Sequence, residues 1–284
     1  MLVLLRLATR LPLSWLYVLG YASYRFSYDI LRWRRGVSLT NLRNAFPDKT
    51  EHERRRIARL SYRNLGDLLA EVLKGATLTK EEIRQRVRIL NPQLITRFTG
   101  QGQSVVLLAS HHCNWEWLLL AASAQLDIPI DAVYKPQRVA AIDRFLREAR
   151  SRFGGNPIPH KQFLLAVRKR KGSARAFALV ADQTPGKSDE KHWTRFLNQD
   201  TAFFVGAEKL ARITRSPVIF VGMQRLSRGH YEARLKLLAA PPYSRDSTDI
   251  IERYAREVEA QIIASPTDFL WLHRKWKYKK PAYR

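Results

Sequence analysis

The chain has 284 residues, 45% of them hydrophobic, which is enough for one sizeable core or for one core with a small appendage. It carries 50 Lys and Arg against 25 Asp and Glu, a formal net charge of +25. This excess points to an anionic partner: nucleic acid, a membrane surface, or an acidic protein or phosphorylated substrate. The single cysteine, Cys113, excludes a disulfide framework and a cysteine-rich metal site, and it fits a reducing compartment.

The N-terminal segment combines an apolar stretch with aromatic residues and arginines. Its 14 uncharged residues 11–24 would form a helix of roughly 21 Å, shorter than a hydrocarbon core of roughly 30 Å. Aromatic residues continue beyond this stretch, and seven arginines stand against one acid, Asp29, before Pro47, as is typical of interfacial segments. We predict a membrane-associating helix over residues 1–35 on the cytoplasmic leaflet. A single membrane span, a signal peptide and a buried helix remain alternative interpretations.

Residues 36–100 show helical periodicity, with apolar residues recurring at helical spacing. Residues that typically begin or end helices bound two stretches of this region. These residues are Asp48 or Thr50 and Gly75 for the first stretch, and Thr79, with Glu82 at the capping-box position, for the second.

From Ser104 onward, short apolar strands alternate with helices, which indicates an α/β fold. The expected strands are 104–110, 130–136, 156–159, 174–183, 217–225 and 230–238, and the expected helices are 114–126, 140–154, 161–172, 206–216 and 248–265. The last strand alternates as an antiparallel strand does, after a turn at Arg228 and Gly229. We predict a mixed, partly parallel central sheet flanked by helices. The chain then divides into residues 1–35 and one domain over 36–284, helical over 36–100 and α/β over 101–284.

A polar cluster from His111 to Glu116 follows the first predicted strand directly. Catalytic groups in open α/β sheets gather at the carboxyl ends of strands. We place His111 on the strand-to-helix loop and Glu116 one turn into the helix, from where its carboxylate can reach back to the imidazole. Such a pair suits deprotonation of a hydroxyl that attacks an acyl carbonyl, because the carboxylate fixes the tautomer and stabilises the imidazolium. Free N–H groups at the helix start could stabilise an anion.

Other interpretations of this cluster stay open. A lone histidine is more often structural than catalytic. Cys113 is a candidate nucleophile with a histidine base, although buried cysteines are commonly inert. Zinc is a further alternative, but the chain has no HExxH motif and no second Cys/His pair. Three residues of the cluster are expected to serve packing: His112, Trp115 and Trp117.

The stretch "SHHCNWEW" resembles the H-x4-D/E block of the bacterial lipid A late acyltransferases, part of the glycerolipid and lysophospholipid acyltransferase superfamily. His111 and Glu116 match its two ends, and Asn114-Trp115 match a common filling. Further blocks follow in the family's order, so the resemblance covers nearly the whole chain. They are 41–47, 62–71, 134–136 with 143–155, 178–186 and 269–277. Arg138 departs from the second block, where the family often has Asn, and we assign no ligand there.

The resemblance implies a glycerolipid acyltransferase-like enzyme on the cytoplasmic face of the bacterial inner membrane. It would transfer a fatty acyl group from acyl–acyl carrier protein, or acyl-CoA, to a hydroxyl of a lipid A precursor, without a metal or other cofactor. His111 would be the general base, Glu116 its partner, and residues 36–284 the acyltransferase domain. The further candidates for substrate binding or for the oxyanion are Arg150, Arg152, Asp182 and Asn114.

Clustered basic residues fit the partners that this resemblance implies. Residues 144–175 hold ten Lys and Arg and one acid, and residues 270–284 hold six and no acid. An acidic acyl carrier protein, anionic membrane lipids and a phosphorylated glycolipid acceptor would each favour such runs. Residues 271–284 also interleave aromatics with cations, as single-strand nucleic-acid binders do. Nucleic acid is nevertheless not expected, since it leaves the apolar N-terminus and the His111–Glu116 pair unexplained. A lysophospholipid or aminolipid acyltransferase and a hydrolase of the same geometry remain alternatives.

Overall fold

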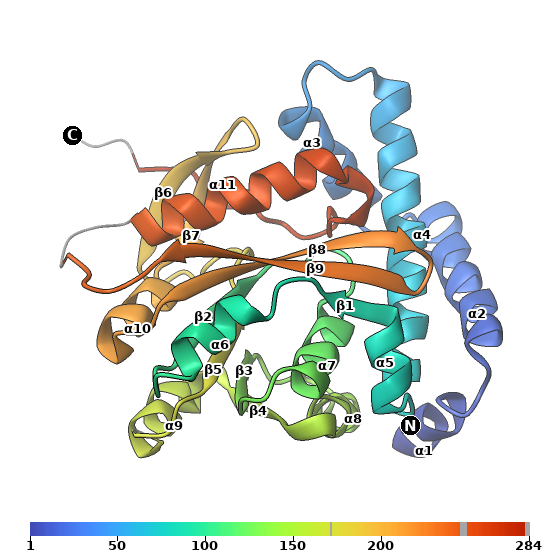
Figure 1. Cartoon of the computed structure of the whole chain (residues 1–284). Helices are drawn as coiled ribbons and strands as arrows, with labels where there is room; N and C mark the ends of the chain where they lie inside the picture. The colour runs from blue at the N-terminus through green and yellow to red at the C-terminus, as the bar shows by residue number, and fades with distance from the viewer. Residues whose placement is uncertain (171, 245–248, 282–284) are drawn as a thin grey trace.

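The computed structural model describes residues 1–170, 172–244 and 249–281, which fold around a seven-stranded sheet (Figure 1). The sheet strands are β1 (Val87–Ile89), β2 (Val105–Ala109), β3 (Ile130–Tyr134), β4 (Gly155–Pro159), β5 (Ala176–Val180), β8 (Val218–Ser227) and β9 (His230–Ala239). The α-helices are α1 (Leu2–Ala8), α2 (Leu13–Arg25), α3 (Arg35–Ala45), α4 (Glu51–Gly75), α5 (Lys80–Arg86), α6 (Gln93–Thr99), α7 (Trp115–Gln125), α8 (Ala140–Arg150), α9 (Phe163–Lys169), α10 (Gly206–Thr214) and α11 (Asp249–Ala264).

The sheet is mixed and mostly parallel, as predicted. Its order is β1-β9-β8-β2-β5-β3-β4, in which the last five strands run parallel to one another and β9 is antiparallel to β8. β2 is apolar throughout because helices cover both faces of the sheet. Val106 and Leu108 face the core shared with α10 and α11, whereas Val105 and Leu107 face the core shared with α5 and α7.

Both predicted helix starts in the N-terminal half are confirmed. Thr50 and Thr79 each accept a hydrogen bond from the backbone N–H three residues on, and the glutamate at that position bonds back to the cap. These capping boxes satisfy backbone donors that the helix itself leaves unpaired. Gly75 is the last residue of α4, as expected.

Two parts of the sheet structure differ from the prediction. Residues Val87–Ile89, inside the segment predicted to be helical, form β1 and pair in parallel with β9. Three residues are too few for a strand pattern to show in the sequence. The hairpin of β6 (Lys191–Phe196) and β7 (Gln199–Phe204) was also not predicted. Its turn places Leu197 and Asn198 at φ 48° and 63°, and leucine at such a position gives no turn signal.

The N-terminal helices pack on the rest of the protein along one side only. On the inner side of α2, Leu16, Gly20 and Tyr24 are buried against the body of the protein, where α2 lies along α4 (Figure 1). A Cβ added at Gly20 would collide with the carbonyl oxygen of Gly66, so these two glycines let the two backbones touch. On the outer side, Trp15 is 65% exposed and Val18 is 62% exposed. Within the described residues, every helix is too short or too polar to cross a bilayer.

A few predicted positions lie outside the described residues. They are Lys171 at the end of the predicted helix 161–172, Thr248 at the start of the predicted helix 248–265, and residues 282–284 of the basic C-terminal run.

Candidate active site

His111 and Asp182 meet at the carboxyl edge of the sheet. Each lies two residues beyond its strand, His111 after β2 and Asp182 after β5, and these strands pair in parallel with Ala109 opposite Val180. Nδ1 of His111 lies 2.7 Å from Oδ1 of Asp182, and the same oxygen accepts the backbone N–H of His111 at 3.0 Å. Asp182 therefore fixes the tautomer in which His111 carries a proton on Nδ1 and a lone pair on Nε2.

The Asp182 carboxylate is held in its charged form although its side chain is only 2% exposed. Burial alone would raise the pKa of this carboxyl. The attraction and hydrogen bonds of His111, together with the charge of Lys275, outweigh burial and hold the pKa below its usual value. A charged Asp182 can stabilise the imidazolium that forms when His111 takes up a proton.

Nε2 of His111 is directed toward the space that a substrate would use. The amide nitrogen of Gln183 lies 3.2 Å from Nε2 and can donate a hydrogen bond to its lone pair. Trp115 packs edge-on against the imidazole, with ring centroids 4.8 Å apart. The imidazole is thus oriented on three sides by Asp182, Gln183 and Trp115, and a substrate hydroxyl can replace the weak contact to Gln183.

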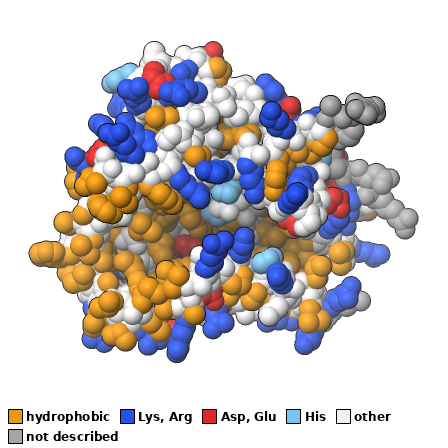
Figure 2. Space-filling view, turned by 180° about the vertical axis from the view of Figure 1, so that it is seen from behind, with side chains coloured by type: hydrophobic (Ala, Val, Ile, Leu, Met, Phe, Trp, Pro, Cys, Tyr) orange, Lys and Arg blue, Asp and Glu red, His pale blue; other side chains and the backbone are white. Residues whose placement is uncertain are grey.

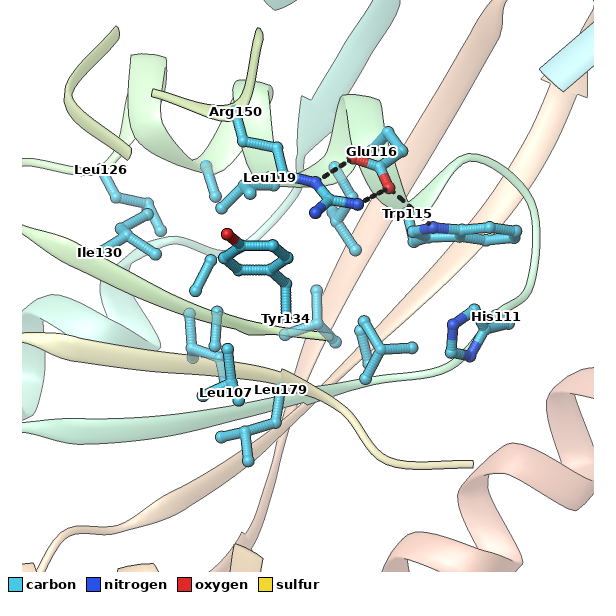
Figure 3. Close-up of a pocket in the computed structure, with 18 of the residues that line it drawn as sticks. Leu107, His111, Trp115, Glu116, Leu119, Leu126, Ile130, Tyr134, Arg150 and Leu179 are labelled. Atoms are coloured by element: carbon cyan, nitrogen blue, oxygen red, sulfur yellow. Dashed lines mark hydrogen bonds and ion pairs between the residues drawn. The ribbon is translucent and has the colours of Figure 1, made fainter. Parts of the chain in front are cut away.

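Glu116 does not pair with His111 in the structure, and this corrects the predicted pairing. Its carboxylate instead accepts two hydrogen bonds from Arg150, at 2.8 Å and 2.6 Å, and a third from the indole of Trp115 at 3.2 Å (Figure 3). Glu116 is the second residue of α7, and it points across the pocket to the last residue of α8. The orienting carboxylate that we had assigned to Glu116 is therefore Asp182, one of the further candidates.

One guanidinium nitrogen of Arg150 has no hydrogen-bond partner among the described residues. This nitrogen, Nη1, is buried, while the other two guanidinium nitrogens bind Glu116. The guanidinium lies 5.4 Å from the centre of the Tyr134 ring and lines the same cavity as His111. The bonds to Glu116 overcome the effect of burial and raise the pKa of Arg150. A buried, charged donor without a partner is suited to bind an oxygen of a ligand.

A cavity of about 350 Å³ opens at these residues (Figure 3). His111 and Trp115 lie at one end of it and Leu126 and Ile130 at the other, and most of its lining residues are apolar (Figure 3). Both ends of β3, Ile130 and Tyr134, line it, so it follows the strand for about 13 Å at roughly 3.3 Å per residue. Its apolar lining also includes Leu107, Leu119, Leu126, Val221 and Leu235. The cavity is thus largely apolar, with the polar side chains of His111, Glu116, Arg150 and Gln183 in its lining.

Asn114 and Arg152, the two remaining site candidates, have structural contacts instead. Asn114 is fully buried, caps α7 by accepting the N–H of Trp117 at 2.9 Å, and donates to the buried carboxylate of Glu71 at 2.7 Å. Arg152 donates to the carbonyl oxygen of Gly75, the last residue of α4, at 3.1 Å. Neither lines the cavity, and we withdraw their assignment to substrate binding or to the oxyanion.

His112 and Cys113 are buried outside the cavity, so neither is positioned as a nucleophile or base there. Nε2 of His112 lies 3.0 Å from the carbonyl oxygen of Ser265. Burial raises the pKa of Cys113 well above its usual value, which keeps the thiol protonated. These contacts do not support the thiol mechanism that the sequence left open.

Sequence reasoning gave no role to Gln183, Glu71 or Lys275. Gln183 directly follows Asp182 and is the last residue of the predicted strand 174–183, so its place at the carboxyl end of that strand is the signal that could have identified it. Glu71 and Lys275 stand inside blocks of the family resemblance, but a buried charge cannot be told from an exposed one in a sequence this rich in charge.

A histidine paired with a buried carboxylate, in a largely apolar cavity that an arginine also lines, is an arrangement suited to acyl transfer. The chain belongs to the bacterial lipid A biosynthesis acyltransferases, since the sequence model of that family matches residues 1–278. This confirms the resemblance noted in the sequence.

Named relatives agree with this membership. The chain is 22% identical to a lipid A biosynthesis acyltransferase of Haemophilus influenzae, over 87% of this chain and 77% of that protein. It is 24% identical to the lipid A biosynthesis lauroyltransferase of Escherichia coli, over 95% and 88% of the two chains. It is also 24% identical to the palmitoleoyltransferase of the same organism, over 94% and 87%. The protein is thus an acyltransferase of lipid A biosynthesis.

Proposed function

We propose that this acyltransferase uses acyl–acyl carrier protein as donor and a hydroxyl of a lipid A precursor as acceptor, with His111 as general base. The observation that carries this proposal is that His111, which is paired with Asp182, lines the largely apolar cavity. The imidazole of His111 can remove a proton from the acceptor, and the cavity can hold the hydrocarbon chain of the donor.

The reaction is a direct transfer. Nε2 of His111 takes the proton of the acceptor hydroxyl while the hydroxyl oxygen attacks the thioester carbonyl. The new C–O bond forms, the C–S bond then breaks to give the ester, and His111 gives the proton to the departing sulfur. Asp182 stabilises the imidazolium between these two proton transfers. No covalent acyl-enzyme is required, since the acceptor oxygen itself is the nucleophile.

Arg150 is our candidate for the oxyanion. Arg150 lines the same cavity as His111, and its Nη1 has no hydrogen-bond partner among the described residues; a donor of this kind stabilises negative charge as it develops on a carbonyl oxygen. Glu116 holds the guanidinium in place through two hydrogen bonds. In this proposal Glu116 is a positioning residue for Arg150 and does not act on His111.

The cavity is proposed to bind the acyl chain. Each methylene group removed from water contributes about 0.8 kcal/mol to binding. An extended chain of single bonds covers the roughly 13 Å along β3 with about ten carbons, with the carbons nearest the thioester beside His111. A medium or long fatty acyl group therefore fits better than an acetyl group.

Mass spectrometry of reaction products tests donor and acceptor together. The enzyme is incubated with acyl–acyl carrier protein or acyl-CoA of several chain lengths, and with a lipid A precursor beside a lysophospholipid. We expect the mass of the lipid A precursor to rise by one acyl group, with the carrier-protein donor preferred. Acylation of the lysophospholipid alone would move the acceptor assignment to the alternative class. Release of free fatty acid alone would indicate a hydrolase.

We further propose that the outer side of the N-terminal helices rests on the cytoplasmic face of the inner membrane. Exposed apolar side chains gather there, beside a hollow bordered by Lys and Arg (Figure 2). The residues more than half exposed are Met1, Val3, Leu4, Leu7, Trp15, Val18, Leu19, Phe26, Ile30 and Leu31. Leaving this much apolar surface in water is unfavourable, and an interfacial helix of this kind commonly lies in a membrane surface.

Charged substitutions on this outer side are expected to release the protein from membranes. The double variant Trp15→Glu/Val18→Glu should move from the membrane pellet to the supernatant, since it leaves the buried contacts of α2 intact and places two charges in the interface. The matched control, Gln101→Glu/Ser188→Glu, changes the net charge equally at exposed sites elsewhere. Equal sedimentation of both variants with membranes would contradict the proposed contact.

A further inference from the structure

The C-terminal segment packs behind the loop that carries Asp182. Lys275 donates a hydrogen bond from its Nζ to the backbone carbonyl oxygen of Asp182. Two residues further along the same loop, the hydroxyl of Thr184 donates to the carbonyl oxygen of Lys275 at 2.7 Å, and its backbone N–H lies 3.3 Å from Nε2 of His273. The loop and the segment are thus joined by reciprocal bonds.

The segment is itself held from the far side by α3. The side-chain amide of Asn41 donates to the carbonyl oxygen of Trp271 at 2.8 Å and to that of His273 at 3.0 Å. Asn41 is buried, and so is Trp271. The position of the Asp182 loop therefore depends on a chain of contacts that begins in the N-terminal part of the protein.

Lys275 is a buried cation that lies against two aromatic rings. The residue is 3% exposed, and its Nζ lies 4.1 Å from the ring centre of Phe203 and 5.2 Å from that of Phe196. Burying an ammonium costs more than burying an apolar side chain of similar volume, so its presence here is not explained by stability. The charge that favours the ammonium form is Asp182.

We propose that Lys275 is a positioning residue for acyl transfer, which fixes the Asp182 loop through its bond to the Asp182 carbonyl oxygen and places a positive charge beside the His111–Asp182 pair. This inference rests on the proposed role of His111 and Asp182. The titratable groups around Lys275 and Asp182 are His111 on the loop after β2, His273 on the C-terminal segment and the buried Tyr254 of α11. β6 and β7 face the ammonium with the Phe196 and Phe203 rings.

The protonation of Lys275 supports this assignment. Burial lowers the pKa of Lys275 to about 8, while attraction to Asp182 opposes the shift. The ammonium is therefore charged at neutral pH and loses its proton as the pH rises through about 8. Activity that depends on this charge should decline over the same range.

Two substitutions separate the charge from the side chain. We expect Lys275→Met to lower kcat by about tenfold or more and to change KM by less than about threefold, because the acyl-binding cavity is untouched. Lys275→Arg retains a positive charge that does not titrate in this range. It should restore most of the activity and shift the alkaline limb of the kcat/KM profile upward by about one pH unit or more. The neighbouring exposed Lys277→Met is the matched control and should keep the wild-type profile.

Two further measurements distinguish positioning from a structural role. Lys275→Met removes a donor and a positive charge from the buried Asp182, which is expected to lower the unfolding temperature, so kcat is measured at a temperature at which circular dichroism shows the variant to be fully folded. In infrared spectra, the protonated-carboxyl band assigned by its loss in Asp182→Asn should appear at a higher pH in Lys275→Met than in the wild type.

The outcomes separate this inference from the proposed function. An unchanged alkaline limb in Lys275→Arg, an unchanged Asp182 band in Lys275→Met, or a loss of activity that only follows a loss of stability would overturn it. A wild-type protein that transfers no acyl group would count against the proposed function, and the infrared titration would still decide the role of Lys275.

Discussion

Replacing His111 by alanine should lower the rate of acyl transfer by about 10²- to 10⁴-fold, the usual contribution of a positioned general base. The loss should appear in kcat, because the cavity that binds the acyl chain remains. The imidazole is partly exposed and lies outside the two main hydrophobic clusters, so the free energy of unfolding should change little. Turnover is measured as transfer of labelled acyl groups to the lipid acceptor.

A substitution of a second histidine, away from the cavity, serves as the control for this experiment. His52 is exposed in the first turn of α4, far along the chain from the site, and His52→Ala should keep wild-type turnover. Wild-type turnover in His111→Ala would exclude the base mechanism altogether.

Separate substitutions of the two carboxylates, Asp182 and Glu116, should give two different defects, one in catalysis alone and one in both catalysis and stability. Asp182→Asn is expected to lower kcat by about 10²- to 10⁴-fold, because a neutral amide no longer stabilises the imidazolium of His111. Glu116→Ala leaves Arg150 as a largely buried charge without its partner. It should therefore lower the free energy of unfolding by about 3 kcal/mol, besides weakening catalysis through the displaced guanidinium. Chemical denaturation and steady-state kinetics on the same preparations separate these effects.

The comparison also tests which carboxylate serves His111 during the reaction. If Glu116→Ala abolished turnover without loss of stability while Asp182→Asn remained active, the pairing predicted from the sequence would be restored for the substrate-bound enzyme. Our structure favours the opposite result, since Nδ1 of His111 already bonds Asp182.

The sequence predicts the architecture through features that act locally. The apolar run of β2, the capping boxes at Thr50 and Thr79 and the alternating pattern of β9 each depend on neighbouring residues. β1 and the β6–β7 hairpin escape prediction because β1 is very short and because the hairpin turn uses a leucine at positive φ.

The candidate site is predictable only in part. The position of His111 follows from one rule, that polar residues gather at the carboxyl ends of buried parallel strands, whereas Asp182 is a candidate only through the family resemblance. The partner of His111 does not follow from spacing in the sequence, because Glu116 is five residues away and Asp182 is 71 residues away. The pairing of β2 with β5 brings Asp182, which is distant along the chain, next to His111 in space.

The direct contact between Gly20 and Gly66 has a mechanical consequence. Two helices whose backbones touch without side chains between them cannot slide or swing apart easily, so α2 is not a flexible tether. With α2 resting on the membrane as proposed, the catalytic pocket would stand at one fixed height and tilt above the lipid headgroups. The enzyme would then reach only acceptors directly beneath it, and it would sample the membrane by lateral diffusion of the whole protein instead of by movement of an arm.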